Sequence, residues 1–158
     1  MEGVMKTLIV YFSYSGNTKK IVDGIEKKFP FDVVCVEREK PYSKDYDECA
    51  YKEAKEEWEK RLEPRIKPLD VDFSRYERIL LFFPIWWYTY PMPIATFIRE
   101  LKGYQGQVVV FANSYSNIPS YMDNVMKDLK DIDKDIHFER GLFNKSIQEH
   151  IAYLERNN

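Results

Sequence analysis

Several residue types that mark common function classes are scarce in this 158-residue sequence. Cysteine occurs only as Cys35 and Cys49 and histidine only as His137 and His150, and no short ligand spacing joins them. We therefore expect no metal site. The early apolar run that ends at Phe12 is too short for the core of a signal peptide, and the cysteines show no disulfide framework, which together favour a cytoplasmic protein.

Glycine is also scarce, with six residues, and the sequence motifs that depend on it are missing. No GxxxxGK[ST] occurs, which excludes a nucleoside triphosphate cradle, and Gly16 and Gly24 do not form GxGxxG. No GxSxG elbow is present for a serine hydrolase. Pro84 stands where a phosphorylated response regulator would need an aspartate.

Charge of either sign is nearly balanced, with 24 basic and 26 acidic residues and a formal net charge of -2. A chain without a sustained basic field is a poor binder of nucleic acid and of anionic membrane surfaces. The uncharged stretch 79–98 is interrupted by Pro84, Pro91 and Pro93 and carries polar aromatic residues, so we expect no membrane insertion.

The overall amino-acid composition favours one globular domain spanning residues 1–158. Hydrophobic residues make up 44% of the chain and charged residues 32%, enough to bury a core beneath a solvated surface. Aromatic residues reach 16%, and this excess calls for a structural explanation.

Apolar runs alternate with amphipathic segments along the chain. The runs predict strands over 6–12, 32–36, 78–83, 107–112 and 136–142. The segments predict helices over 18–29, 45–62, 91–101, 120–129 and 146–154, with a proline in the first turn of the third. Ser120 with Asp123 and Ser146 with Glu149 resemble capping boxes. The many charges of 45–62 are expected to form a solvated helix face.

Five strands that alternate with five helices predict a doubly wound α/β fold. We expect a three-layer sandwich with a five-stranded parallel sheet of order 2-1-3-4-5 and helices on both faces. In that order the ligand crevice lies at the carboxyl ends of the strands, where the winding reverses. The loops 13–18, 84–90 and 113–117 are therefore predicted to meet at one crevice.

The first of these loops has hydroxyl groups and one glycine in front of a predicted helix. Ser13, Ser15 and Thr18 supply the hydroxyls, and the free N–H groups at a helix N-terminus favour an anion such as a phosphate. The simpler interpretation is that Asn17 or Thr18 caps the helix.

The other two loops offer aromatic rings and polar groups. Trp86, Trp87, Tyr88 and Tyr90 suit a flat, partly apolar ligand, although one of the tryptophans is expected to cover the core instead. The segment 113–117 could donate hydrogen bonds to a polar ring edge, and ordinary turn chemistry explains its composition equally well.

The segment Tyr11–Thr18 resembles the phosphate loop of the flavodoxin family, usually S/T-x-T-G-N-T. The residues Pro84-Ile85-Trp86-Trp87, followed by Pro91-Met92-Pro93, resemble a short-chain branch with a P-I-W-W loop. The resemblance implies a flavodoxin-like fold that holds FMN noncovalently, with the first loop at the phosphate and the second at the isoalloxazine ring. With the predicted crevice, the expected FMN-binding residues are Ser13, Tyr14, Ser15, Gly16, Asn17, Thr18, Pro84, Ile85, Trp86, Trp87, Tyr88, Asn113, Ser114 and Tyr115.

The sequence departs from this family pattern at three places. Ser15 stands where threonine is usual, Tyr88 where glycine is frequent, and residues 113–116 replace a loop that is often glycine-rich. Glycine takes positive φ easily and tyrosine does not. If a peptide near the flavin must flip to stabilise one-electron-reduced FMN, Tyr88 is expected to resist the flip.

Three functions fit these observations. The first is an FMN-dependent electron carrier that serves redox partner proteins or a small-molecule acceptor, and for which we assign no catalytic residues. The second is an NAD(P)H-dependent FMN oxidoreductase acting on quinones or similar acceptors. The third is a flavodoxin-like binding module that has lost its flavin.

Overall fold

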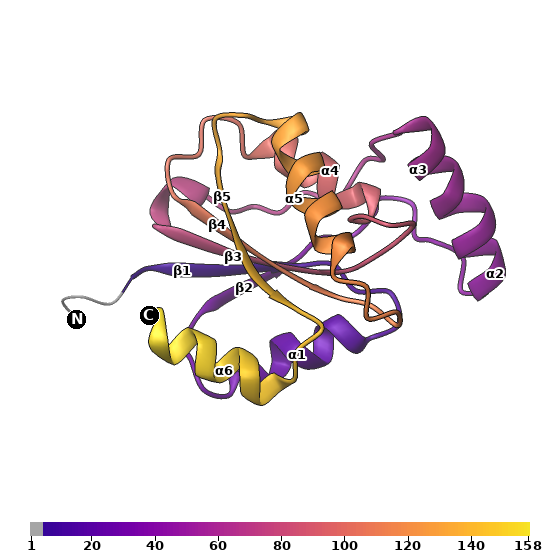
Figure 1. The fold of residues 1–158 in the computed structure, drawn as a ribbon. Helices are drawn as coiled ribbons and strands as arrows, with labels where there is room; N and C mark the ends of the chain where they lie inside the picture. Colours follow the sequence, from indigo (N-terminus) through magenta and orange to yellow (C-terminus); the bar gives the residue numbers. More distant parts are fainter. Residues whose placement is uncertain (1–4) are drawn as a thin grey trace.

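The computed structural model describes residues 5–158 and is organised around a five-stranded parallel sheet (Figure 1). The sheet order β2-β1-β3-β4-β5 confirms the predicted order and the α/β fold class. Residues 1–4 of the predicted domain lie outside the described residues. The strands are β1 (Thr7–Tyr11), β2 (Asp32–Cys35), β3 (Arg78–Pro84), β4 (Gln107–Asn113) and β5 (His137–Phe143).

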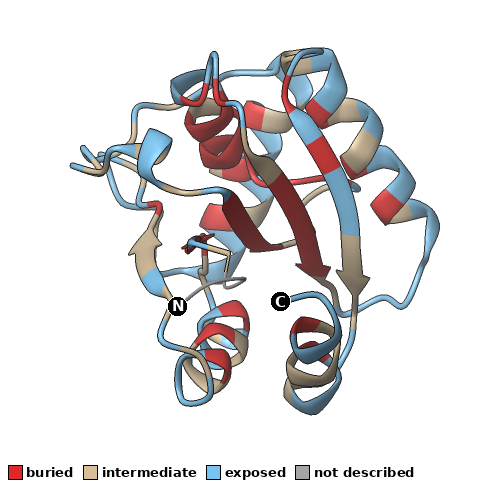
Figure 2. Ribbon diagram, turned by 90° about the vertical axis from the view of Figure 1, so that its left-hand side faces the viewer, coloured by how far each residue is buried: buried red, intermediate tan, exposed pale blue. Residues whose placement is uncertain are grey.

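The central strand β3 is apolar at almost every position because both of its faces are covered. Leu80 pairs with Ile9 of β1 and with Val109 of β4, and these three side chains pack on one face of the sheet. Leu81, the next residue, packs on the other face. Successive side chains of a strand alternate between faces, so a doubly covered strand needs apolar residues throughout. Figure 2 shows buried residues along the strands in the middle of the sheet.

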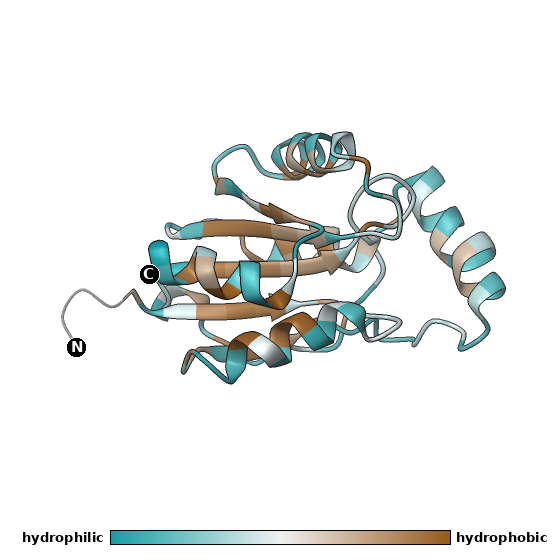
Figure 3. Cartoon of the chain, turned by 60° about the horizontal axis from the view of Figure 1, so that its bottom comes forward, coloured by the Kyte–Doolittle hydropathy of each residue, from teal (hydrophilic) through white to brown (hydrophobic). Residues whose placement is uncertain are grey.

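Two helices cover each face of the sheet. On one face lie α1 (Asn17–Glu26) and α6 (Ile147–Arg156), and on the other lie α4 (Met92–Glu100) and α5 (Ser120–Ile132) (Figure 1). Each helix turns its apolar side to the sheet and its polar side outward (Figure 3). The predicted helix over 18–29 ends earlier, at Glu26, and residues 27–29 form a turn closed by N–H groups on the carbonyl of Ile25.

The helix starts confirm two predictions and correct one. Pro93 lies in the first turn of α4, and the Ser146 hydroxyl at the start of α6 accepts the Glu149 N–H. The predicted capping box at Ser120 is wrong, because this residue already lies inside α5 and its side chain caps nothing. Pro119 precedes it, and its own backbone is already helical.

The predicted helix over 45–62 is confirmed as one helical run over residues 46–60, although its middle part is π-helical. This segment forms an arm, residues 46–60, made of α2 (Tyr46–Glu48), the π-helix η1 (Cys49–Ala54) and α3 (Lys55–Lys60). The arm extends beyond the carboxyl ends of the strands (Figure 1). A short 3-10 turn, η2 (Phe73–Arg75), precedes β3. Wide π turns occur mostly as single interruptions of α-helices and often at functional sites.

The charged residues of the arm are not all solvated, contrary to the prediction. Glu57 is buried, and its carboxylate accepts hydrogen bonds from the Tyr42 hydroxyl and the Arg38 guanidinium. The Arg38 Nη2 atom lies 2.9 Å from Glu57 Oε2. Burial raises the pKa of Glu57, while the Tyr42 hydrogen bond and the Arg38 charge oppose the rise. This cluster attaches the arm to the segment that follows β2.

Two further properties concern the described part of the chain as a whole. No helix within residues 5–158 is long and apolar enough to cross a bilayer. Over the same residues, His, Cys, Asp and Glu side chains form no group of three or more that could hold a metal ion.

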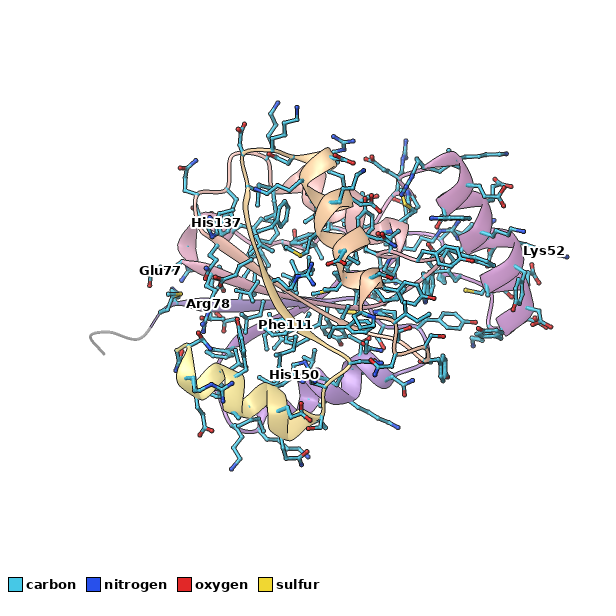
Figure 4. All side chains as sticks on the ribbon, viewed as in Figure 1. Lys52, Glu77, Arg78, Phe111, His137 and His150 are labelled. Atoms are coloured by element: carbon cyan, nitrogen blue, oxygen red, sulfur yellow. The ribbon has the colours of Figure 1, made fainter. Side chains whose placement is uncertain are left out.

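His150 is buried between α6 and the sheet, below Phe111 (Figure 4). Its ring lies 5.9 Å from the Phe82 ring centre and 5.6 Å from that of Phe111, and its Nδ1–H donates to the Ser146 carbonyl at 2.7 Å. Burial lowers the pKa of His150, so the neutral imidazole is the form that fits the folded protein.

We expect His150 to reduce stability in acid. As pH falls through the ordinary histidine pKa of about 6.5, the unfolded chain takes up a proton that folded His150 resists, so the free energy of unfolding decreases. Urea unfolding between about pH 8 and about pH 5 should show a shallower acid loss in His150→Gln than in the parent. Equal slopes in the parent and in His150→Gln would contradict the assignment.

Candidate cofactor site

A hollow of about 320 Å³ opens at the carboxyl ends of β1, β3 and β4. It lies where the predicted loops 13–18, 84–90 and 113–117 approach one another, and we call it the loop hollow. Its lining consists of Tyr14, Ser15, Asn17, Thr18, Ile21, Tyr46, Pro84, Ile85, Trp86, Asn113, Ser114 and Tyr115. No lining side chain is an Asp, Glu, His, Lys or Arg, so the hollow offers hydrogen bonds and ring faces without a charged group.

One end of the loop hollow is formed by the N-terminus of α1. Gly16 precedes the helix with φ of 99°, a left-handed conformation that glycine adopts without strain. The backbone N–H groups of residues 15–18 make no hydrogen bond with any residue in 5–158. Such a run of free donors at a helix N-terminus binds anions well.

Thr18 links the first loop to the third. Its side chain is almost completely buried, and its hydroxyl donates to Asn113 Oδ1 at 2.8 Å. The alternative that Asn17 or Thr18 caps the helix is wrong, because neither side chain caps α1. The Ser13 hydroxyl oxygen accepts the Lys19 N–H at 3.3 Å and so joins the first loop to the first turn of α1.

The third loop is held by a residue that the sequence analysis did not single out. Asn144, just after β5, accepts the Ser114 N–H on its Oδ1 atom at 2.7 Å and has φ of 58°. The Asn113 carbonyl accepts the Ile85 N–H at 2.8 Å, which joins this loop to the second. Asparagine tolerates positive φ, and its side-chain amide can bond to a neighbouring backbone. The position of Asn144 directly after a strand was the sequence signal that could have marked it as part of the site.

Trp86 forms the wall between the loop hollow and the core. Its ring makes edge contacts with Phe12, Tyr14 and Tyr42 at centre distances of 5.2, 5.8 and 5.2 Å. This is the tryptophan that covers the core, as one of the pair was predicted to do. The same ring still lines the hollow.

Trp87 and Tyr88 form a tight turn with both residues at positive φ, 49° and 72°. The turn is closed by two hydrogen bonds, from Trp86 N–H to the Thr89 carbonyl at 2.8 Å and from Thr89 N–H to the Trp86 carbonyl at 3.3 Å. Two-residue turns of this kind strongly favour Asn-Gly. Bulky aromatic residues adopt this conformation only where their surroundings hold them there.

The arm provides these surroundings. The Trp87 indole N–H donates to the Ala50 carbonyl of η1 at 2.8 Å, and its ring stacks on Trp58 with centres 5.8 Å apart. On the other side, Asn124 of α5 donates to the Tyr88 carbonyl at 3.1 Å. Trp87 and Tyr88 therefore face the arm and α5 and do not line the loop hollow.

A second hollow, of about 220 Å³, lies between the arm and the second loop, and we call it the arm hollow. It shares Tyr14, Tyr46, Ile85 and Trp86 with the loop hollow, so the two are neighbours. Its remaining lining consists of Cys49, Ala50, Tyr51, Ala54 and Trp87.

Neither cysteine is poised for thiolate chemistry. Burial raises the pKa of Cys49 to about 11, partly offset by a hydrogen bond with Tyr14. Burial also raises the pKa of Cys35, against a hydrogen bond with Tyr11. Both side chains are neutral thiols at pH 7.

The predicted site residues divide into two groups. Those that line the loop hollow are Tyr14, Ser15, Asn17, Thr18, Pro84, Ile85, Trp86, Asn113, Ser114 and Tyr115. Ser13 and Gly16 belong to the first loop but do not line the hollow, and Trp87 and Tyr88 face the arm. Ile21 of α1 and Tyr46 of α2 complete the lining and were missed. Tyr46 is exposed in the structure, and its sequence position in an amphipathic segment gave no signal for a place at the hollow.

The family model described as Flavodoxin matches residues 6–156. The chain belongs to the flavodoxin family. This membership and the observed strand order confirm the resemblance seen in the phosphate loop and the P-I-W-W segment. No curated protein matches this flavodoxin-family sequence.

Several solved structures are similar to this flavodoxin-family chain over nearly its whole length. A flavoprotein from Lactobacillus acidophilus NCFM, described as a complex with FMN, is 22% identical, with a TM-score of 0.79 over 94% of this chain and 99% of its own. A protein described as a flavoprotein from Bacteroides eggerthii DSM 20697 is 27% identical, with a TM-score of 0.80 over 97% and 98%. Another from Bacteroides uniformis ATCC 8492 is 24% identical, with a TM-score of 0.81 over 96% and 98%.

We expect the Trp87 indole hydrogen bond to stabilise the second loop measurably. Trp87→Phe keeps an aromatic ring but removes the donor to Ala50, and should lower the free energy of unfolding in urea by about 1 kcal/mol. Trp58→Phe is the matched control, because the Trp58 indole N–H has no hydrogen-bond partner among residues 5–158. An equal loss in both variants would show that ring packing, and not the hydrogen bond, holds the turn.

Proposed function

We propose that this chain binds FMN in the loop hollow and uses it to transfer electrons. The observation that carries the proposal is the run of free N–H groups of residues 15–18 at one end of an uncharged, aromatic-walled hollow. Membership of the flavodoxin family supports it, as does the similar fold of the Lactobacillus acidophilus flavoprotein, which is described as a complex with FMN.

The α1 end of the loop hollow fits the phosphate of FMN. Four consecutive backbone donors are available there, and the exposed Ser15 hydroxyl adds another. The helix dipole favours a negative charge at this position. Thr18 and Asn113 are already bonded to each other, so they hold the first and third loops together beside the phosphate.

The opposite end fits a flat heteroaromatic ring. Trp86 offers a ring face or edge, and Tyr115 stands at the rim with 90% of its surface exposed. Backbone and amide groups of Asn113 and Ser114 supply polar contacts to the ring edge. Of the aromatic residues in the second loop, Trp86 is the one that lines the loop hollow.

Bound FMN would supply the electron-transfer chemistry, and the chain would bind and orient it. No Asp, Glu, His, Lys, Arg or Cys side chain lines the loop hollow, and its hydroxyl groups come from serine, threonine and tyrosine. The exposed rim at Tyr115 leaves the ring end accessible to a partner protein or a small molecule.

FMN binding should be visible as quenching of flavin fluorescence. Ser15→Asp places a carboxylate at the predicted phosphate and should weaken FMN binding at least about tenfold, because like charges at a few ångströms cost about 1–4 kcal/mol. Riboflavin, which lacks the phosphate, should be affected much less. Ser120→Asp, at the exposed start of α5, is the matched control and should bind FMN as the parent does.

Two outcomes of this titration would contradict the proposal. Absence of quenching by the parent protein at about 50 μM, a concentration that detects micromolar dissociation constants, would favour a flavin-free binding module. Equal losses of FMN and riboflavin affinity in Ser15→Asp would mean that the phosphate does not bind at α1.

We also expect the FMN-loaded protein to accumulate little one-electron-reduced flavin during photoreduction. The Trp87 indole bond to Ala50 and the Asn124 bond to the Tyr88 carbonyl hold this turn in one conformation. Bulky residues also restrict the backbone conformations that a flipped Trp87–Tyr88 peptide would need. Tyr88→Gly frees the backbone and should increase the visible absorbance of that form. A large, persistent absorbance of the one-electron form in the parent would overturn the expectation.

A further inference from the structure

An open groove of about 510 Å³ lies on the exposed side of the arm. Only arm residues line it, and all of them are exposed, whereas Ala54 and Glu57 between them are buried. Lys52 points away from the sheet (Figure 4). We call this the outer groove, and its lining consists of Tyr51, Lys52, Lys55, Glu56, Glu59 and Lys60. None of these residues lines the loop hollow, so the outer groove is separate from the candidate cofactor site.

The lining residues form two rows along the arm, residues 51, 55 and 59 and residues 52, 56 and 60. In an α-helix of 3.6 residues per turn, a spacing of four advances about 40° beyond a full turn, so such a row drifts around the helix. Residues 49–54 are π-helical, and the wider π turn holds more residues and reduces this drift. The π-helix η1 therefore helps to keep both rows on one face of the arm.

Most of the charge in the outer groove is unpaired within one copy of the chain. Lys55 Nζ lies 3.8 Å from Glu59 Oε1, and both side chains remain about half exposed. The ion pairs of residues 5–158 include none with Lys52, Glu56 or Lys60. These charges are therefore available to another molecule.

The order of the charges makes the outer groove complementary to itself. If a second copy packs antiparallel about a two-fold axis between residues 55 and 56, Lys55 faces Glu56 of the second copy. In the same arrangement Lys52 faces Glu59 of the second copy. Two-fold symmetry makes each pairing occur twice, so a single register joins four ion pairs.

Other registers bring like charges together. A parallel pairing would place each lysine against the same lysine of the second copy, and each glutamate against the same glutamate. A shift of the antiparallel pairing by four residues places Lys52 against Lys55 in one direction and Glu56 against Glu59 in the other. Opposed like charges disfavour these arrangements, so the charge order selects one antiparallel register.

We propose that the outer groove is the contact surface between two copies of this chain, which pair antiparallel through their arms. Tyr51, with 57% of its surface exposed, supplies the apolar contact, and Lys60 of the second copy faces its ring, an arrangement that attracts an ammonium group. Exposed ion pairs are individually weak, so the charges set the register and the dimer dissociates readily. This inference goes beyond FMN binding and does not depend on it.

Sedimentation velocity of the FMN-free protein tests the pairing. At low salt the parent should change from monomer to dimer as its concentration rises to about 200 μM, which detects dissociation constants in the micromolar range. At about 1 M salt, where the Debye length is about 3 Å, dissociation should be at least about tenfold easier.

A pair of charge reversals tests the register. Lys52→Glu places a carboxylate opposite Glu59 of the second copy, and Glu59→Lys places an ammonium opposite Lys52. Each variant alone should dimerise at least about tenfold more weakly than the parent, and an equimolar mixture should recover the parent affinity to within about threefold. Lys28→Glu, an exposed lysine after α1, makes the same change of charge outside the groove and should dimerise as the parent does.

Three results would overturn the inference: a monomeric parent at about 200 μM and low salt, parent affinity in both reversed variants, or a loss that the mixture does not recover. If circular dichroism shows that Lys52→Glu disturbs the arm, Lys55→Glu mixed with Glu56→Lys tests the same register nearer the axis. FMN titration of the variants is a separate measurement and should match the parent. Failure of the pairing and failure of the proposed function are therefore distinguished.

Discussion

The left-handed turn at Trp87 and Tyr88 is the constraint on which the candidate site depends. Positive φ costs a bulky residue about 1–2 kcal/mol, and this turn contains two such residues in succession. The indole hydrogen bond to Ala50 contributes about 1 kcal/mol, and aromatic pairs contribute about 0.5–1.5 kcal/mol each. The contacts with the arm are thus large enough to offset the strain. This turn directs the Trp86 side chain toward the core, where the Trp86 ring forms a wall of both hollows.

The arm can hold the turn only if it is itself fixed to the sheet. Glu57 provides this attachment through Arg38 and Tyr42, both of which follow β2 in the chain. A buried carboxylate with two such partners defines one position for the arm more sharply than apolar contact alone. The π-helix η1 lies between this anchor and Trp87. The Ala50 carbonyl of η1 accepts the hydrogen bond from the Trp87 indole N–H. The site is therefore assembled from the arm, which follows β2, and from the loops that follow β1, β3 and β4.

The strands and helices of the scaffold were predicted well because the spacing of apolar residues along the chain determines which faces are buried. Each strand was found within one residue at either end, and the order of the sheet followed from alternation and chain connectivity. The first loop was predicted because Gly16 and its hydroxyl neighbours are local signals. The helix of the arm was predicted from its amphipathic pattern, but its π-helical middle was not, because a π turn has no clear sequence signature. The burial of Glu57 was not predicted either, because its partner Arg38 is distant in sequence. The orientation of Trp87 and Tyr88 depends on Ala50, Trp58 and Asn124, which no local pattern connects to them.

Mapping of amide chemical shifts during an FMN titration tests the account most directly. The protein has another, larger hollow of about 640 Å³ at the opposite end of the sheet, formed by residues 71–74, 76, 77 and 100–106. If FMN binds as proposed, the shifted amides lie in residues 13–18, 84–88 and 113–115, with the largest changes at 15–18. Shifts concentrated in 71–77 and 100–106, with the α1 N-terminus unchanged, would contradict the account.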